Sequence, residues 1–123
     1  MQELGLQKQI TFVVGADLVK IKYLYEHCRA LIHPSLAEGF GLPIIEAMYF
    51  QKPIIASDIL PFKELAKNQY LAFFPHDEKA LLDQIKRLLD QKINQVDYGN
   101  FETEFNFEKM TQTTLGVYQN CLK

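Results

Sequence analysis

The chain has 123 residues, of which 48% are hydrophobic and 23% charged, and its formal net charge is −2. These values suit one soluble globular domain rather than a disordered or fibrous chain. The near-neutral balance argues against a surface that binds a nucleic-acid backbone, because such binding relies on clustered lysine and arginine. It leaves open a site for one small anion held by backbone N–H groups.

The cysteines and the N-terminal residues bear on the cellular compartment. Cys28 and Cys121 are the two cysteines, and their spacing indicates neither a disulfide framework nor a zinc site. No apolar run approaches the roughly 18 residues that a membrane-spanning helix requires. Residues 1–5 lack the basic-then-apolar order of a signal peptide. The sequence therefore predicts a cytoplasmic protein.

Short apolar runs alternate with longer amphipathic segments along the chain. In chain order the patterns predict a strand at 10–14, a helix at 17–28, a strand at 30–32, a helix at 42–50, a strand at 53–56, a helix at 61–66, a strand at 71–74, and helices at 78–91 and about 107–122. Asp17 is a plausible N-cap and Pro43 suits a first helical turn. Residues 92–100 are polar and predict a loop or a frayed helix.

This alternation predicts an α/β fold, a Rossmann-like parallel sheet with helices on both faces. We treat residues 1–123 as a single, partial domain of this kind. Among the aromatic residues, Phe12, Phe73 and Phe74 fall on predicted strands, so we expect them in the core. We expect the side chain of Phe40 to pack beneath its loop.

A glycine-bearing loop joins the second predicted strand to the following helix, with the sequence Pro-Ser-Leu-Ala-Glu-Gly-Phe-Gly-Leu-Pro at 34–43. Open α/β sheets bind ligands beyond the carboxyl ends of their strands, which is where this loop lies. Gly39 and Gly41 allow unusual backbone dihedrals and close approach of a ligand. The helix that follows offers free N–H groups and the positive end of its dipole. A diphosphate suits such a site.

Two carboxylates flank the predicted phosphate site. Glu38 precedes the glycines, and Glu46 lies about one turn inside the helix. Carboxylates would repel phosphates, but they accept hydrogen bonds well from hydroxyl groups. Sugar hydroxyls on one side and ribose hydroxyls on the other would satisfy both. A nucleotide diphosphate sugar has that layout.

The same loop resembles a known family. Residues 34–48 look like the Glu-x7-Glu signature of family 4 glycosyltransferases, and the resemblance extends to 53–58, Glu64, 75–77 and 105–107. It covers about 10–118. The resemblance implies a retaining glycosyltransferase with the GT-B fold, which consists of two Rossmann-like domains. In that fold the donor is bound mainly by the C-terminal domain, to which this chain would correspond.

The family's roles carry over to matching positions of this chain. Glu38 would contact the hydroxyls of the donor sugar as the catalytic carboxylate, and Glu46 would hold the ribose hydroxyls. The backbone N–H groups of Gly39, Phe40, Gly41 and Leu42 would face the diphosphate or the sugar. The resemblance implies no divalent metal and no other cofactor. It implies a hexose donor and a glycan, lipid or small-molecule acceptor.

Two departures from the family pattern stand out. The family usually has glycine where this chain has Gln51, which predicts a local change of turn at that helix end. The Arg and Lys that neutralise the leaving diphosphate in the family lie upstream of the matching segment, as does the acceptor domain. We therefore expect this chain alone to be inactive. We expect the complete enzyme to be cytoplasmic or peripheral at the inner face of the membrane.

Several alternatives remain open from the residues. The chain is either the donor-binding region of a longer or two-chain enzyme, or a non-catalytic nucleotide-sugar-binding fragment. A nucleotide-sugar epimerase or a phosphorylase is a third possibility, which the loop favours less. His33 follows a strand and suits a packed residue or a neighbour of the site better than a general base. If the last helix lacks a covering domain, its apolar face predicts self-association.

Overall fold

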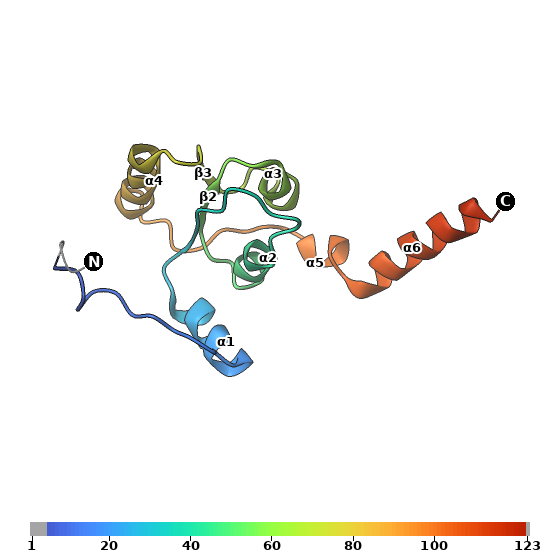
Figure 1. Cartoon of the computed structure of the whole chain (residues 1–123), viewed down its shortest axis with the longest axis horizontal. Helices are drawn as coiled ribbons and strands as arrows, with labels where there is room; N and C mark the ends of the chain where they lie inside the picture. The colour runs from blue at the N-terminus through green and yellow to red at the C-terminus, as the bar shows by residue number, and fades with distance from the viewer. Residues whose placement is uncertain (1–4, 123) are drawn as a thin grey trace.

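The computed structural model describes residues 5–122, and Figure 1 shows the path of the chain. The N-terminal residues 1–4, on which most of the expectation of no signal peptide rests, lie outside the described part. Three short parallel strands form one sheet in the order β1-β2-β3. They are β1 (Leu31–His33), β2 (Ile54–Ser57) and β3 (Leu71–Phe73). The centre of the sheet is β2, which pairs with both neighbours.

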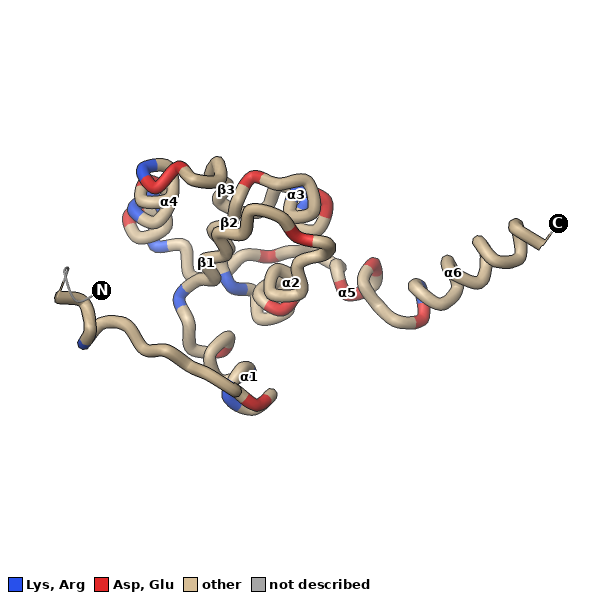
Figure 2. Tube along the Cα trace, viewed as in Figure 1, with Lys and Arg blue, Asp and Glu red and all other residues tan. Residues whose placement is uncertain are grey.

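Six helices are found among the described residues. They are α1 (Leu18–His27), α2 (Leu42–Tyr49), α3 (Leu60–Ala66), α4 (Glu78–Asp90), α5 (Phe101–Glu104) and α6 (Phe107–Cys121). Within this part of the chain no helix is both long and apolar enough to cross a bilayer. Acidic and basic residues are interspersed along the trace, as Figure 2 shows. The predicted positions of five helices and three of the four strands are confirmed to within a few residues.

Helices cover both faces of the sheet, as the sequence predicts. On β2, the side chains of Ile54 and Ala56 belong to a cluster with α2 and α3. Ile55 lies between them in sequence and packs instead with Phe73 and Leu88, which brings α4 onto the other face. Successive strand residues point to opposite faces, so four buried residues in a row require a layer on each side. Figure 1 shows these two layers.

The strand predicted at 10–14 is absent. These residues form an irregular, exposed segment in which Phe12 is 72% and Val14 92% exposed. A strand needs a neighbour for its backbone hydrogen bonds, and no described residue pairs with this segment. The expectation that Phe12 is a core residue is therefore wrong. It is wrong for Phe74 also, which follows the end of β3 and is exposed, whereas Phe73 is buried.

The polar stretch at 92–100 is a loop that belongs to the core despite its composition. The amide of Val96 donates to the carbonyl of Gln51 at 3.0 Å. The side chain of Tyr98 is buried, and its hydroxyl donates to the carbonyl of Lys52 at 2.8 Å. The short helix α5, which the sequence analysis does not predict, follows directly. The loop thereby ties the end of the chain to the turn after α2.

The turn after α2 is the one that glycine would form, although Gln51 occupies it. Gln51 has a φ of 53°. Its amide donates to Met48, and the amide of Lys52 donates to Ala47, both at 2.9 Å. These two bonds are those of a Schellman motif, which requires a left-handed residue at this position. The predicted change of turn is therefore wrong, and Gln51 bears the backbone strain instead.

Candidate functional site

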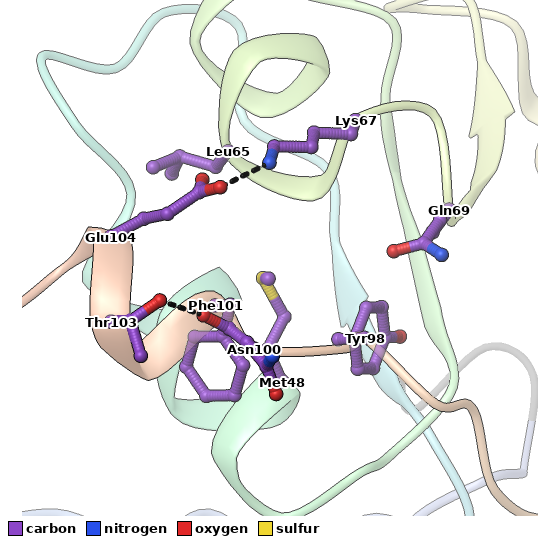
Figure 3. A pocket seen from close by; sticks show the side chains of 9 residues that line it. All are labelled: Met48, Leu65, Lys67, Gln69, Tyr98, Asn100, Phe101, Thr103 and Glu104. Atoms are coloured by element: carbon purple, nitrogen blue, oxygen red, sulfur yellow. Dashed lines mark hydrogen bonds and ion pairs between the residues drawn. The ribbon is translucent and has the colours of Figure 1, made fainter.

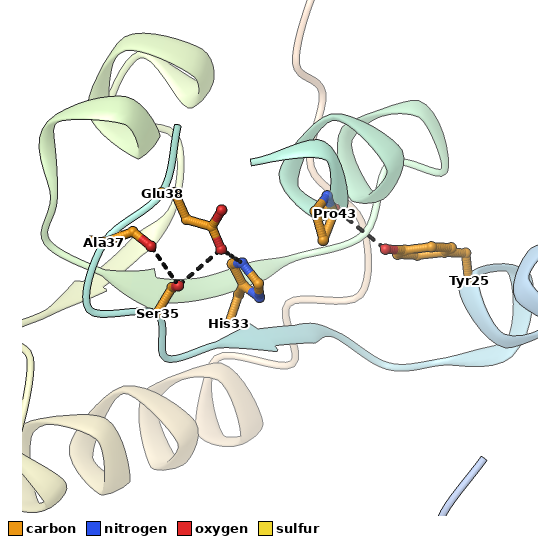
Figure 4. A network of polar contacts seen from close by, with 6 residues as sticks. All are labelled: Tyr25, His33, Ser35, Ala37, Glu38 and Pro43. Carbon is orange, nitrogen blue, oxygen red and sulfur yellow. Dashed lines mark hydrogen bonds and ion pairs between the residues drawn. The ribbon is translucent and has the colours of Figure 1, made fainter. Parts of the chain in front are cut away.

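The candidate site lies where the loop at 34–41 leaves the carboxyl end of β1 and enters α2 (Figure 4). The ends of β1 and β2 meet at this edge, because the strands are parallel and in register from Leu31 and Ile54 onward. His33 is the last residue of β1. The loop thus begins at the edge of the sheet where α/β proteins bind their ligands.

Gly41 is the residue that the loop geometry demands. It caps α2 with a φ of 100°, a conformation that side chains rarely adopt. A Cβ atom there would lie 2.8 Å from Cε1 of Phe62, a fully buried ring. Gly39 differs, since no atom lies within 4 Å of the corresponding position and its φ is not left-handed. Gly41 therefore requires glycine for its backbone conformation, whereas Gly39 does not.

The start of α2 presents free backbone donors. Gly41 provides no side-chain cap, and Pro43 in the first turn has no N–H. Within the described residues, the amides of Gly39, Phe40, Gly41 and Leu42 donate no hydrogen bond to the protein. Together with the positive end of the helix dipole, such amides can hold an anion.

The carboxylate of Glu38 is held by one side chain from the loop and one from the end of β1. Its Oε1 accepts a hydrogen bond from the Ser35 hydroxyl at 2.8 Å and lies 3.1 Å from Nε2 of His33. Both contacts lower the pKa of Glu38, and the hydrogen bond from Ser35 has the larger effect, followed by that from His33. Figure 4 shows this cluster. The carboxylate is thus kept ionised and in a defined orientation.

Glu46 lies on the exposed side of α2 and meets helix α1. The hydroxyl of Tyr25 donates to Oε2 of Glu46 at 2.8 Å and lies 3.4 Å from the carbonyl oxygen of Pro43. Burial, and then the hydrogen bond to Glu46, raise the pKa of Tyr25. A cavity of about 370 Å³ between α1 and β1 is lined by both residues. Glu46 therefore lies at the edge of the cavity between α1 and β1.

The structure thus brings together the predicted site residues of the loop and α2, although their binding roles stay predictions. In sequence, Glu38 and Glu46 lie on either side of the amides at 39–42. Phe40 does not pack beneath the loop as expected, because its ring is 46% exposed and meets Phe105 edge-on at 6.1 Å. Leu42 is exposed beside it, and both line a groove of about 580 Å³ that reaches α6.

Sequence reasoning missed one site neighbour, Tyr25. The sequence pattern places Tyr25 within the predicted helix at 17–28 and gives it no role in the site. Its contact with Glu46 joins residues 21 positions apart in the chain. No local pattern signals such a contact, since it depends on how α1 meets α2.

Another pocket is separate from this site. It has a volume of about 310 Å³ and lies by the C-terminal halves of α2 and α3 (Figure 3). The ion pair between Lys67 and Glu104, at 2.6 Å, is part of its wall. That pair lowers the pKa of Glu104 through the hydrogen bond and the charge of Lys67. Among residues 5–122 no group of three His, Cys, Asp or Glu side chains is placed to hold a metal ion.

A parallel α/β sheet with a glycine-bearing loop and a helix N-terminus at its carboxyl edge is the arrangement of a Rossmann-like domain. The family model for glycosyl transferases group 1 matches residues 1–105. The chain belongs to this family of glycosyltransferases.

Curated relatives and a solved structure agree with this assignment. The chain is 37% identical to the O-antigen chain mannosyltransferase RfbU of Salmonella typhimurium over 89% of its length, and 29% identical to O-antigen chain mannosyltransferase B of Escherichia coli over 94%. Sucrose-phosphate synthase from Thermosynechococcus elongatus superposes with a TM-score of 0.80 and 29% identity, over 98% of this chain. The fold is therefore the Rossmann-like fold of a GT-B neighbour.

The chain covers only part of each relative. It spans 31% of RfbU, 30% of mannosyltransferase B and 32% of the sucrose-phosphate synthase chain. The chain is thus about a third as long as the proteins that it matches.

Proposed function

We propose that this chain is the donor-binding region of a retaining family 4 glycosyltransferase. It would take part in the transfer of a hexose from a nucleotide diphosphate sugar to a glycan, lipid or small-molecule acceptor. The observation that carries the proposal is the site at the start of α2. There, the amides at 39–42 donate to no group among the described residues, and in sequence they lie between Glu38 and Glu46.

Each part of the donor has a counterpart in this site. The amides and the dipole of α2 suit the diphosphate, since both offer positive charge without a side chain. Within residues 5–122, Oε2 of Glu38 accepts no hydrogen bond, so that oxygen can accept from sugar hydroxyls. Glu46 would accept from the ribose hydroxyls, which would compete with or join Tyr25 at the same carboxylate.

The chemistry assigned to this region is stabilisation of charge. As the bond from the sugar to the diphosphate breaks, negative charge grows on the phosphate oxygens and positive charge on the sugar ring. Donors fixed at the start of a helix stabilise the first charge at no cost of reorganisation. The carboxylate of Glu38 lies on the sugar side and would orient the ring. We propose no metal or other cofactor for this step.

The identity of the sugar and the acceptor rests on the relatives. Both curated relatives described above are named as O-antigen chain mannosyltransferases. We therefore propose mannose as the first sugar to test and a polysaccharide as the first acceptor. The nucleotide is not specified by these names, so UDP, GDP and ADP derivatives all belong in the test.

We further propose that transfer requires more than this chain. The relatives are about three times as long, and cationic groups for the departing diphosphate are absent from the loop and from the start of α2. A longer polypeptide or a partner chain would supply those cations and the acceptor site. The alternative is a chain that binds a nucleotide sugar and takes no part in catalysis.

Calorimetric titration of the chain tests the binding proposal directly. The ligands are UDP, GDP and ADP, each alone and linked to glucose or mannose. We expect weak binding of one nucleotide series, which Glu46→Ala abolishes. Glu38→Ala should weaken only the sugar-linked forms. The matched control is Glu108→Ala, which removes an exposed carboxylate from α6.

The outcomes separate the hypotheses. Binding that Glu46→Ala and Glu38→Ala leave unchanged would contradict the proposed site, even if the nucleotide binds elsewhere. No binding of any nucleotide by the folded chain would contradict an independent donor-binding region. Binding together with sugar transfer by the chain alone would contradict the requirement for a further part.

A further inference from the structure

The contacts around Glu38 are unequal for its two carboxylate oxygens. Oε1 faces both the Ser35 hydroxyl at 2.8 Å and Nε2 of His33 at 3.1 Å. The Ser35 oxygen also lies 3.2 Å from the carbonyl of Ala37. A hydroxyl has one proton to donate, and the charged carboxylate is the closer and stronger acceptor. Ser35 alone therefore supplies one hydrogen bond, and His33 supplies the second.

The contact with His33 defines which ring nitrogen carries a proton. An ionised carboxylate only accepts hydrogen bonds, so Nε2 of His33 must be protonated for the contact at 3.1 Å to be attractive. The histidine is then either the neutral Nε2–H tautomer or the imidazolium. In both forms, the proton on Nε2 points at Oε1 of Glu38.

The ring of His33 is itself held in place. It belongs to the last residue of β1, which is paired with Ala56 of β2. Its centroid lies 5.3 Å from that of Phe62. The same Phe62 ring is the one that leaves no room for a side chain at Gly41. One buried ring therefore supports both the histidine that contacts Glu38 and the glycine that starts α2.

We propose that His33 is a positioning residue for the donor sugar: its Nε2–H group fixes Oε1 of Glu38, so that Oε2 is presented to the sugar hydroxyls. This inference rests on the proposed function, since it assigns Glu38 to the sugar. It adds that the preference for a sugar-linked nucleotide over the bare nucleotide depends on a residue of β1, which lies outside the loop and α2. His33 touches no substrate in this role and transfers no proton.

The role predicts a defined pattern of affinities. Removal of the His33 donor lets the carboxylate of Glu38 rotate and weakens only the bonds to the sugar. The affinity for the nucleotide diphosphate stays unchanged, because the amides at 39–42 and Glu46 are untouched. A hydrogen bond to a charged group is commonly worth a factor of about ten or more in affinity. We expect the ratio of sugar-linked to bare nucleotide affinity to fall about tenfold.

Two substitutions at the same position make the test specific. His33→Leu removes the donor and retains an apolar side chain against Phe62. His33→Gln carries its amide nitrogen the same number of bonds from the backbone as Nε2 of histidine, so it retains the donor. We expect His33→Leu to lower the ratio in titration calorimetry and His33→Gln to restore most of it. A merely structural role for His33 would not give this rescue by a polar residue.

A second measurement stands apart from donor binding. The carboxyl carbon of Glu38 is followed by ¹³C nuclear magnetic resonance as the pH is lowered, with Glu38→Gln to assign the signal. We expect His33→Leu to raise the pKa of Glu38 toward the ordinary value of a glutamate, and Ser35→Ala to do so independently. Asp58 and Lys63 form another charged pair at this sheet edge, at 2.7 Å. No variant in this test changes either residue, so the pair does not account for a difference in the pKa of Glu38 between variants.

The two readouts distinguish failure of this inference from failure of the proposed function. If His33→Leu changes neither the pKa of Glu38 nor the affinity ratio, the positioning role is overturned whatever the chain binds. If the pKa responds but Glu38→Ala leaves the affinity for nucleotide sugars unchanged, Glu38 is positioned for something other than a donor sugar. That result overturns the sugar assignment and with it this inference.

Discussion

The centre of the molecule and its two ends have similar sequence patterns but different packing. Helices α1, α2 and α6 all carry apolar residues at helical spacing. In α2 three of them are buried, namely Ile44, Ala47 and Met48, whereas α1 and α6 bury none. Figure 1 shows α1 and α6 extending away from the layers around β2. An apolar stripe thus predicts a helix, but burial requires a neighbouring layer.

The start of α2 differs from the starts of α1 and α6. The exposed helices α1 and α6 begin with side-chain caps, in which Asp17 accepts from the amide of Lys20 and Asn106 from that of Lys109. The buried helix α2 begins at Gly41 with no such cap. Such caps satisfy backbone amides at helix starts, and α4, which packs on the sheet, also has one, at Asp77. In α2 no side chain caps the start, and the amides at 39–42 donate to no group among the described residues.

The largest effect is expected from truncating a central side chain. Phe62 is fully buried between the sheet, Gly41 and His33, so Phe62→Ala should lower the free energy of unfolding by about 3–5 kcal/mol. The matched control is Phe107→Ala at the start of α6, where the side chain is 84% exposed. That change should cost less than about 0.5 kcal/mol. Urea denaturation followed by circular dichroism measures both, and equal losses would contradict the contrast between centre and end.

Next in size is a comparison of the two loop glycines. Gly41→Ala should destabilise the chain by about 2–3 kcal/mol, because the new methyl group meets Phe62 in a left-handed conformation. Gly39→Ala meets no atom within 4 Å and should be nearly neutral. Denaturation curves for the two variants decide the matter. A stable Gly41→Ala variant would mean that the start of α2 is less constrained than the structure indicates.

A smaller effect tests whether the loop at 92–100 belongs to the centre. Tyr98→Phe removes the hydroxyl that donates to the carbonyl of Lys52 and leaves that carbonyl without this partner. We expect a loss of about 1–2 kcal/mol in the free energy of unfolding. The control is Tyr118→Phe on α6, whose side chain is exposed. If both variants unfold like the wild type, the loop adds little to the stability of the core.

The smallest expected effect concerns the turn after α2. Gln51→Gly relieves a left-handed backbone of about 1 kcal/mol, but glycine also loses more chain entropy on folding. The net gain should lie between zero and about 1 kcal/mol. Gln51→Ala is the control, because it keeps the strain and removes only the side chain. Differential scanning calorimetry resolves the difference, and destabilisation by glycine would show that the Gln51 side chain itself stabilises this turn.

Particular residues show where sequence reasoning succeeded. Asp17 caps α1, Pro43 lies in the first turn of α2, and Gly41 has the unusual dihedral that its loop required. Each of these features depends on a few neighbouring residues. The alternation of apolar runs also predicts the parallel sheet with a helical layer on each face, because four consecutive buried residues in β2 have no other explanation.

Other residues show where it failed, in most cases because the outcome depends on distant segments. The apolar run at 10–14 is as strand-like as that of β2, but no partner strand lies beside it. Phe74 lies one residue beyond β3 and is exposed for that reason. The polar loop at 92–100 buries Tyr98 because distant carbonyls accept its hydrogen bond. Tyr25 reaches Glu46 only through the placement of α1 against α2.

By itself, the sequence determined five of the six helices found among the described residues, the three strands of the sheet, the family and the pair of carboxylates beside the loop glycines. These follow from local periodicity, capping and motif spacing, which the chain carries residue by residue. The tertiary structure decided which apolar runs are buried and which side chains hold Glu38 and Glu46. Those outcomes depend on contacts between segments far apart in the chain, where backbone pairing and a buried ring such as Phe62 select one arrangement.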